Sequence, residues 1–229
     1  MKIAIVTGAS GNLGQAVVKK FIDKGYKVFG TVIPNDPAQL DFPAESFQAI
    51  VVDLMNEEAS QKFVADVISK EGSIDVAVLT VGGFAMGNIA NTSTSDIMKQ
   101  YKLNFETAYN IAKPSFIQML KQNSGRIFFI GSRPGINAAN SKGMVAYGLG
   151  KSLIFRLAEL MNEEAKGHNV VSAVVVPSTI DTPQNRQAMP DAHFDSWVKP
   201  EDIAGIIYYH TTEETNTLRE TVIKAYNNA

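Results

Sequence analysis

Short runs of apolar residues alternate along the chain with longer segments in which apolar positions recur every three or four residues. Short continuous apolar runs are typical of buried β-strands, and the longer periodicity is typical of helices with one buried face. The short runs predict strands near residues 2–7, 27–32, 48–52, 74–79, 126–131, 169–176 and 220–225. The longer segments predict helices near residues 12–24, 57–70, 95–121, 144–166 and 200–211.

The predicted strands are apolar on both faces, as the segment 169–176 illustrates. Strands of this kind are typical of a parallel sheet that is covered by helices on each side, and the alternation of strand and helix supports that arrangement. We therefore expect residues 1–229 to form a single α/β domain with a doubly wound parallel sheet. A chain of 229 residues is long enough for one such domain with a full core.

Composition narrows the classes of partner and compartment. The net charge of −2 gives no reason to expect a nucleic acid or an anionic membrane as a partner. The chain has no cysteine, which excludes disulfides and thiolate chemistry. The first predicted strand begins at residue 2, which leaves no room for a signal peptide, and no apolar stretch approaches membrane-spanning length. We therefore expect a cytoplasmic protein.

A glycine-rich turn joins the first predicted strand to the first predicted helix. Gly8, Gly11 and Gly14 follow strand 2–7 and run directly into helix 12–24. Glycines at such a turn let backbone N–H groups approach a pyrophosphate, which then lies at the positive end of the helix dipole. At the start of an alternating strand and helix chain, the turn indicates a dinucleotide site of the Rossmann type. The alternative is an ordinary glycine-rich connection.

Two Tyr-x-x-x-Lys pairs compete for a catalytic role, and in each pair the two side chains share a helix face: Tyr147 with Lys151, and Tyr109 with Lys113. A phenol ionises near pH ~10, and a neighbouring ammonium favours the phenolate, so such a pair can exchange a proton at neutral pH. Tyr147 follows a predicted buried strand that ends at Ser132, whereas Tyr109 lies inside a long helix. We therefore favour Tyr147 and interpret Tyr109 as a core or interface residue.

These features occur in an order that resembles the short-chain dehydrogenase/reductase family across the whole chain. The resemblance rests on the glycine turn and on residues spread along the sequence: Asp53, Leu54, Gly82, Gly83, Asn104, Ser132, Tyr147, Lys151, Pro177 and Thr182. Within the family, the segments 82–87, 143–151 and 179–197 resemble the dihydropteridine reductase branch, and the last of them is long and unusual.

The resemblance implies catalytic roles for four residues. Tyr147 would be the general acid, and Lys151 would depress its pKa and hydrogen-bond the nicotinamide ribose. Asn104 would hold a water molecule in the proton relay, and Ser132 would orient the substrate oxygen. The implied reaction is a hydride transfer from a nicotinamide cofactor, NAD or NADP.

The resemblance also implies a cofactor site. Asp53 would meet the adenine edge, Gly82 and Gly83 would let the chain pass close to the cofactor, and Thr182 would contact the nicotinamide carboxamide. The full predicted set is Gly8, Ser10, Gly11, Asn12, Leu13, Gly14, Val32, Asp53, Leu54, Gly82, Gly83, Lys151, Pro177 and Thr182.

Two departures from the dihydropteridine reductase branch bear on substrate and cofactor. That branch typically carries alanine where this chain has Ser132, because a quinonoid dihydropterin needs no hydroxyl to polarise a carbonyl. It would also place aspartate where Val32 stands, and a carboxylate there binds the ribose 2′-OH and selects NAD. Asp36 could act from the loop instead, and no basic residue lies between Gly8 and Gly14 to bind a 2′-phosphate. NADH is therefore slightly favoured.

The remaining candidate residues divide between packing and function. His168, His193 and His210 have no carboxylate or cysteine at metal-ligand spacing, so no metal site is expected. A further group of large apolar side chains either packs in the core or frames a flat substrate as an apolar lid: Phe84, Met86, Met189, Phe194 and Trp197.

The sequence therefore predicts an NAD(P)H-dependent reductase of a small molecule, either a quinonoid dihydropterin or a small carbonyl compound. Helices 95–121 and 144–166 correspond to the pair that packs against a twofold mate in the family, so we expect a homodimer or homotetramer. A non-catalytic dinucleotide-sensing protein of the same fold is the alternative, because the glycine spacing Gly-x-x-Gly-x-x-Gly departs from the common pattern of the family. The presence of Ser132, Tyr147 and Lys151 counts against it.

Overall fold

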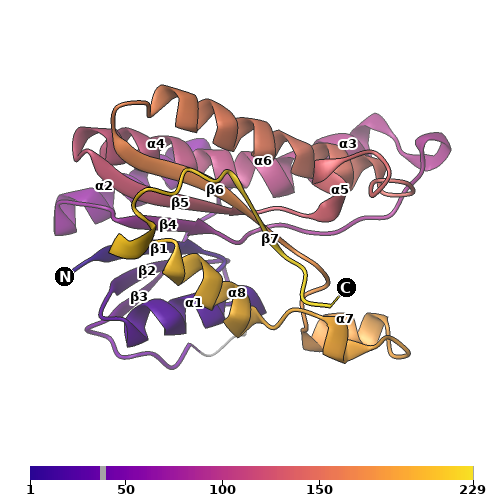
Figure 1. The fold of residues 1–229 in the computed structure, drawn as a ribbon, viewed down its shortest axis with the longest axis horizontal. Helices are drawn as coiled ribbons and strands as arrows, with labels where there is room; N and C mark the ends of the chain where they lie inside the picture. The colour runs from indigo at the N-terminus through magenta and orange to yellow at the C-terminus, as the bar shows by residue number, and fades with distance from the viewer. Residues whose placement is uncertain (37–39, 229) are drawn as a thin grey trace.

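The computed structural model describes residues 1–36 and 40–228 and contains a seven-stranded sheet (Figure 1). All strand pairs are parallel, and the strands lie in the order β3-β2-β1-β4-β5-β6-β7. Each predicted strand is present, with ends that differ by at most a few residues: β1 (Ile3–Thr7), β2 (Lys27–Val32), β3 (Phe47–Val51), β4 (Val76–Leu79), β5 (Ser124–Ile130), β6 (Asn169–Pro177) and β7 (Val222–Ala225).

Helices cover both faces of the sheet, as predicted. Figure 1 shows α1 (Asn12–Asp23) and α8 (Pro200–Tyr209) on one side, and α2 (Glu57–Glu71), α4 (Thr107–Lys121) and α6 (Val145–Glu164) on the other. The chain is thus a doubly wound α/β fold. No helix in the described part of the chain is both long and apolar enough to cross a membrane.

Each face of the sheet has its own apolar core. Phe21 of α1 and Ile203 of α8 pack in one core, and Phe63, Ile111 and Ile154 pack in the other. Strands β1 and β4 are buried along their whole length, which explains their continuous apolar sequences. The edge strand β3 is largely exposed, so the prediction of strands buried on both faces holds for the centre of the sheet and not for this edge.

The strand order reverses beside β1, whose neighbours are β2 on one side and β4 on the other. Connections that leave the sheet in opposite directions at such a point open a crevice at the carboxyl ends of the strands, where ligands bind in open α/β sheets. The glycine turn that follows β1 and the segment 80–83 that follows β4 both lie at this point.

The predicted helix 95–121 is divided in the structure. Helix α3 (Thr94–Tyr101) begins with a capping box in which Ser93 and Asp96 satisfy each other's backbone N–H groups. A π-helical turn, Lys102–Glu106, follows and leads directly into α4. A π-helical turn contains an additional residue that a regular helical periodicity does not predict, and such turns occur frequently at functional sites.

Two short helices at strand ends were not predicted. Helix α5 (Arg133–Ile136) follows β5, and α7 (Pro183–Ala188) follows β6. Three 3₁₀ turns were also missed: Ile89–Asn91, Phe194–Ser196 and Glu213–Thr215. Segments of this length are too short to establish a helical period, which is why the apolar pattern did not reveal them.

Candidate active site

The glycine turn after β1 is held by backbone contacts that leave no room for side chains. Gly8 has a φ of 61°, and its N–H donates to Thr31 Oγ1 at 3.2 Å. The N–H of Gly11 donates to the carbonyl of Gly8 at 3.0 Å. A Cβ placed on Gly14 would lie 2.0 Å from that same carbonyl oxygen. The turn therefore brings the start of α1 against β1 as closely as a phosphate-binding turn requires.

A cavity of about 570 Å³ opens above this turn. It is lined by most of the residues predicted to bind the cofactor: Gly8, Ser10, Gly11, Asn12, Leu13, Gly14, Val32, Asp53, Leu54, Gly82 and Thr182. Its lining also includes residues that were not predicted, namely Thr31, Ile33, Pro34, Val52, Met55, Thr80, Val81, Leu103, Thr107 and Ile180, together with Asp36. Thr31 could have been suspected, because it is a hydroxyl residue in an otherwise apolar strand that ends at Val32.

Three members of the predicted cofactor set lie outside this lining. Gly83 binds the side chain of Asn104 through its N–H group, and Pro177 ends β6, where it pairs with Ala225 of β7. Lys151 is buried, and its Nζ would lie 3.0 Å from a Cβ on Gly82, which itself lines the cavity. The lysine thus reaches the edge of the cavity from α6.

Lys151 donates a hydrogen bond from Nζ to the carbonyl oxygen of Ile130, the last residue of β5, at 2.8 Å. Only 5% of its surface is exposed, and burial lowers the pKa of Lys151 to about 8. Burial also raises the pKa of Tyr147 above its ordinary value, and a hydrogen bond from Ser132 offsets part of that rise. The predicted lowering of the Tyr147 pKa by Lys151 is therefore wrong in direction, because desolvation of the phenol outweighs the other contributions.

The Ser132 hydroxyl lies at the end of β5 and is buried. It has no hydrogen-bond partner of standard geometry among the described residues, although it is near enough to Tyr147 to influence the pKa of the phenol. The influence on the phenol places Ser132 beside Tyr147, at a distance or angle outside that of a well-formed hydrogen bond. A buried hydroxyl without a well-formed bond is suited to make one with a ligand.

Asn104 lies in the π-helical turn and is completely buried. Its Oδ1 accepts the N–H of Gly83 at 3.1 Å, and its Nδ2 donates to the carbonyl of Gly83 at 3.0 Å and to Gln100 Oε1 at 2.8 Å. The side chain therefore fixes the segment that carries Gly82 and Gly83. Sequence reasoning missed Gln100, although a polar residue one turn before Asn104 on the same helix face was a usable signal.

The predicted lid residues divide between two environments. Trp197 is buried against Phe194, with ring centroids 4.9 Å apart, so these two rings pack together. Phe84 packs edge-on against Tyr147 with ring centroids 5.2 Å apart and yet is 62% exposed, and Met86 is exposed as well. Phe84 is therefore an exposed aromatic surface next to the phenol. Met189, on the other segment, is also exposed.

Tyr109 is not a core residue. Its ring is 36% exposed, stacks on Phe105 and has the ammonium of Lys113 above it. Lys113 pairs with Glu57 of α2, and the Tyr109–Lys113 pair does not line the cavity above the glycine turn. Tyr147 does not line that cavity either, so the choice of Tyr147 over Tyr109 stays a prediction, as does a role for Tyr109 in an interface.

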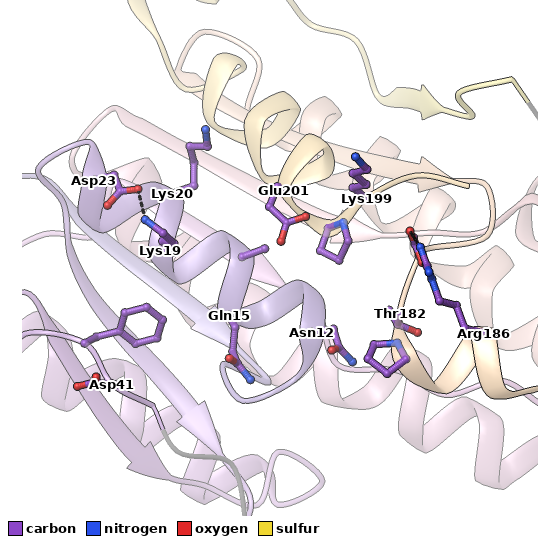
Figure 2. Close-up of a pocket in the computed structure, with 15 residues that line it drawn as sticks. Asn12, Gln15, Lys19, Lys20, Asp23, Asp41, Thr182, Arg186, Lys199 and Glu201 are labelled. Atoms are coloured by element: carbon purple, nitrogen blue, oxygen red, sulfur yellow. Dashed lines mark hydrogen bonds and ion pairs between the residues drawn. The ribbon is translucent and has the colours of Figure 1, made fainter. Parts of the chain in front are cut away.

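A second and larger cavity, of about 910 Å³, lies beside α1 and is shown in Figure 2. It shares Asn12 and Thr182 with the first cavity, and neither cavity is lined by Ser132, Tyr147 or Lys151. Its charged residues balance, with Lys19 bound to Asp23 and Arg186 bound to Asp181. The smaller cavity is the candidate site, because it is lined by the glycine turn and by Gly82, beside which Lys151 Nζ lies. No group of His, Cys, Asp or Glu able to hold a metal ion occurs in the described ranges.

Comparisons with known proteins agree with this geometry. Residues 2–193 match the family model described as short chain dehydrogenase. An acetoacetyl-CoA reductase of Acinetobacter sp. (strain RA3849) is 30% identical over 80% of this chain and 75% of its own length. A cyclic-di-GMP-binding biofilm dispersal mediator protein of Escherichia coli (strain K12) is 27% identical over 90% of this chain and 87% of its own. A dihydropteridine reductase of Dictyostelium discoideum is 26% identical over 92% and 88%.

Solved structures include proteins with the same fold as this chain. A short-chain dehydrogenase/reductase from Serratia marcescens BCRC 10948 superimposes with a TM-score of 0.81 and 23% sequence identity, over 100% of this chain and 98% of that one. At this level of identity the likeness concerns the fold. The sequence resemblance, including its dihydropteridine reductase component, is confirmed by the relatives.

Proposed function

We propose a reaction for this chain from the premise that it belongs to the short-chain dehydrogenase family and is an NAD(P)-dependent oxidoreductase. Residues 1–229 act as one reductase domain that transfers hydride to a small carbonyl compound. Tyr147 is the general acid, and Ser132 binds the substrate oxygen.

The observation that carries this proposal is the buried Ser132 hydroxyl, which lies beside Tyr147 and has no well-formed hydrogen bond. Reduction of a carbonyl develops negative charge on oxygen, and a preorganised donor next to the proton source stabilises that charge. A substrate oxygen between Ser132 and Tyr147 would satisfy the serine hydroxyl and receive the proton of the phenol.

Burial raises the pKa of Tyr147, so the phenol carries its proton at neutral pH, as an ordinary phenol does, and releases it less readily than an exposed one. Lys151, held by the Ile130 carbonyl, directs a cationic group toward Gly82 at the edge of the cavity. There it would bind the ribose of the cofactor, as the family resemblance implies. Asn104 keeps the Gly82–Gly83 segment in place, and its predicted part in a water relay belongs to the same proposal.

The cavity fits a nicotinamide dinucleotide. Its floor is the glycine turn, where Gly14 lets the start of α1 pack closely against Gly8, and the first N–H groups of α1 would bind a pyrophosphate there. When bound, the cofactor would supply the hydride. Thr182 lines the cavity and directly precedes α7. There it would contact the carboxamide of the nicotinamide.

NADH is the cofactor that the charges of the cavity favour. The ionisable residues that line the described part of the cavity are Asp36 and Asp53, and no lysine or arginine lines it there. Carboxylates accept hydrogen bonds from ribose hydroxyls and repel a 2′-phosphate. This agrees with the slight preference for NADH that the sequence indicated.

The test is the substitution Ser132→Ala, assayed with NADH and NADPH on acetoacetyl-CoA, on a panel of small ketones and aldehydes, and on quinonoid dihydropterin. We expect the rate on carbonyl substrates to fall by ~10²- to 10³-fold, the usual cost of removing one such donor. Ser115→Ala is the matched control, because Ser115 is also buried without a partner in the described chain but lies in α4. If Ser132→Ala reduces the best carbonyl substrate as fast as the parent, the carbonyl reductase proposal is wrong.

Reduction of a quinonoid dihydropterin is the second candidate, and the exposed ring of Phe84 favours it. This ring stands next to Tyr147 and offers a flat apolar surface to a flat substrate. The similarity to a dihydropteridine reductase over 92% of the chain points the same way. Because a quinonoid substrate makes little demand on a carbonyl-polarising hydroxyl, its reduction should survive Ser132→Ala within a few fold.

A non-catalytic dinucleotide-sensing role remains the alternative, and the similarity to a protein described as cyclic-di-GMP-binding gives it a concrete ligand. A sensor has no need of a serine, a tyrosine and a buried lysine gathered at the edge of the cavity. Calorimetric titration with NADH and with cyclic-di-GMP separates the two: the enzyme should bind NADH, whereas binding of cyclic-di-GMP alone would support the sensor.

Self-association through α4 and α6 completes the proposal. Large apolar side chains are exposed on these helices: Tyr109, Ile117, Leu149, Leu153 and Leu160. Exposed apolar residues concentrated on two helices are typical of a subunit interface. We expect light scattering to report a dimer or tetramer of the 24.9 kDa chain, and a monomer at micromolar concentration would contradict this part of the proposal.

A further inference from the structure

The side-chain amide of Asn104 has one orientation that suits its neighbours. A backbone N–H can only donate and a carbonyl oxygen can only accept. Gly83 presents its N–H to Oδ1 of Asn104 and its carbonyl to Nδ2, at 3.1 and 3.0 Å. If the amide were rotated by half a turn, Nδ2 would face the N–H of Gly83 and Oδ1 would face its carbonyl oxygen. Gly83 and the residue on the other side of the amide therefore determine its orientation.

Gln100 is that partner. It lies one turn earlier, in α3, and only 4% of its surface is exposed. Its side-chain oxygen accepts from Asn104 Nδ2 at 2.8 Å, and its backbone carbonyl accepts from the same nitrogen at 3.3 Å. The side-chain bond is the shorter of the two, and its loss would leave Nδ2 with weaker acceptors in a buried position.

The orientation of the amide matters because Lys151 lies close by. A Cβ on Gly82 would be 2.7 Å from Asn104 Oδ1 and 3.0 Å from Lys151 Nζ, so the amide oxygen and the ammonium both lie beside Gly82. The amide oxygen is thus near a buried cation. The α3 backbone also touches α6 between Tyr147 and Lys151, because a Cβ on Gly150 would lie 2.9 Å from the Gln100 carbonyl oxygen.

We propose that Gln100 is a positioning residue for the reactive centre: its side-chain oxygen holds the Asn104 amide with Oδ1 toward Gly82 and Lys151. The amide oxygen favours the charged form of Lys151, which burial alone disfavours. This inference rests on the proposed function in one respect only, namely that the charge of Lys151 contributes to turnover.

Other charged groups do not account for the environment of Lys151. The elements packed against it carry several ionisable side chains: Lys99 on α3, Lys102 and Glu106 on the π-helical turn, Arg133 on α5 and Tyr147 on α6 itself. None of these contributes to the shift in the pKa of Lys151, whose one cause is burial. The influence that we propose for the Asn104 amide would act in addition to burial.

Two substitutions of similar shape separate the oxygen of Gln100 from its bulk. Gln100→Met removes the shortest of the three hydrogen bonds made by Asn104 Nδ2 and leaves both bonds to Gly83, so the amide should be held less firmly and the pKa of Lys151 should fall below its value of about 8. Gln100→Glu keeps an acceptor oxygen and adds negative charge, so the pKa of Lys151 should rise. We expect Gln100→Met to lose about tenfold or more in kcat at neutral pH with little change in the KM for cofactor, and Gln100→Glu to retain most of it.

The primary measurement is a ¹³C NMR titration of the Lys151 Cε resonance in lysine-labelled protein, assigned by its loss in Lys151→Arg. Asn162→Leu is the control, because Asn162 lies on α6 like Lys151 but makes its two hydrogen bonds to the backbone of Ser172 in β6. Opposite shifts in the two Gln100 variants and none in the control support the proposal. An unchanged titration in Gln100→Met, or a fall in Gln100→Glu as well, overturns it. This titration requires no turnover. If the parent protein reduced none of the substrates tested, the proposed function would be wrong, but the effect of Gln100 on the pKa of Lys151 could still be measured.

Discussion

Backbone contacts determine the geometry of the glycine turn after β1, whereas buried side chains determine the geometry around Tyr147. The turn depends on contacts such as that between Gly14 and the Gly8 carbonyl, which admit no side chain. The reactive centre depends on Lys151 and Asn104, which are polar groups enclosed by the fold. A backbone turn binds whatever presents a pyrophosphate, and enclosed polar groups hold particular protonation states. We therefore propose that the first region provides affinity for the cofactor and the second provides the chemistry.

The largest expected effect tests that division at Tyr147. Tyr147→Phe removes the proton donor, and loss of a general acid typically costs ~10²- to 10⁴-fold in rate. Cofactor affinity, measured by the change in nicotinamide fluorescence on binding, should stay close to that of the parent, because the glycine turn is untouched. Tyr109→Phe is the matched control. Comparable losses in the two variants would show that the reactive centre has been misplaced.

The next effect concerns the pH dependence of stability. Lys151 has a pKa of about 8 in the folded protein and an ordinary value of 10.5 when unfolded. Between these values the unfolded chain binds more protons, so the free energy of unfolding should rise with pH across this window, by up to about 3 kcal/mol. Below the window both states are protonated, and the cost of burying the charge is fully present.

The measurement is urea unfolding on both sides of that window. Lys151→Met should abolish the rise, because methionine has no proton to release, whereas Lys113→Met should keep it, because the Lys113 side chain is 43% exposed. An equal rise in the free energy of unfolding of Lys151→Met would mean that another group causes it and that burial does not lower the pKa of Lys151.

The same division explains which parts of the site could be predicted from sequence. The strands and the glycine turn follow from local patterns of apolar residues and glycines, and both were predicted. The strand order, with its reversal beside β1, was not predicted, because it depends on which strands pair. The raised pKa of Tyr147 was not, because it depends on how much of the phenol the fold encloses. The sequence shows Lys151 one turn away from Tyr147 but does not show that burial lowers the pKa of the lysine as well.

The π-helical turn illustrates a second limit. Residues 95–121 have the apolar periodicity of one helix, and the structure interrupts that helix at Lys102–Glu106. The turn places Asn104 against the Gly82–Gly83 segment, a contact between parts of the chain about twenty residues apart that no local pattern encodes. Gln100 lies one turn before Asn104 on the same helix face, which was a usable signal, but its contact with the Asn104 amide is visible only in the structure.

Smaller effects are expected where the backbone carries the geometry. Gly14→Ala would place a Cβ 2.0 Å from the Gly8 carbonyl, and insertion of an atom into such a contact typically costs about 1–3 kcal/mol. Cofactor affinity should fall with stability, because the same turn serves both. Gly205→Ala is the control: it lies in α8 with open space around it, and alanine there should stabilise the helix by about 0.5–1 kcal/mol. Thermal unfolding with and without NADH measures both, and unchanged cofactor binding in Gly14→Ala would separate the turn from the cofactor.

The smallest expected effect concerns Val32 beside the glycine turn, where a side chain rather than the backbone would select between NADH and NADPH. Val32 ends β2 and lines the cavity together with Asp36 and Asp53. A carboxylate at this position would accept a hydrogen bond from the ribose 2′-OH and repel a 2′-phosphate. Val32→Asp should therefore raise the preference for NADH over NADPH at least tenfold, a difference of ~1.4 kcal/mol in relative kcat/KM.

Val51→Asp is the control. It introduces the same charge at the residue of β3 that pairs with Val32, where the side chain is exposed and does not line the cavity. A change confined to Val32→Asp places the ribose at the end of β2. Equal changes in both variants would instead reflect the overall charge of the protein, and no change in either would place the ribose elsewhere.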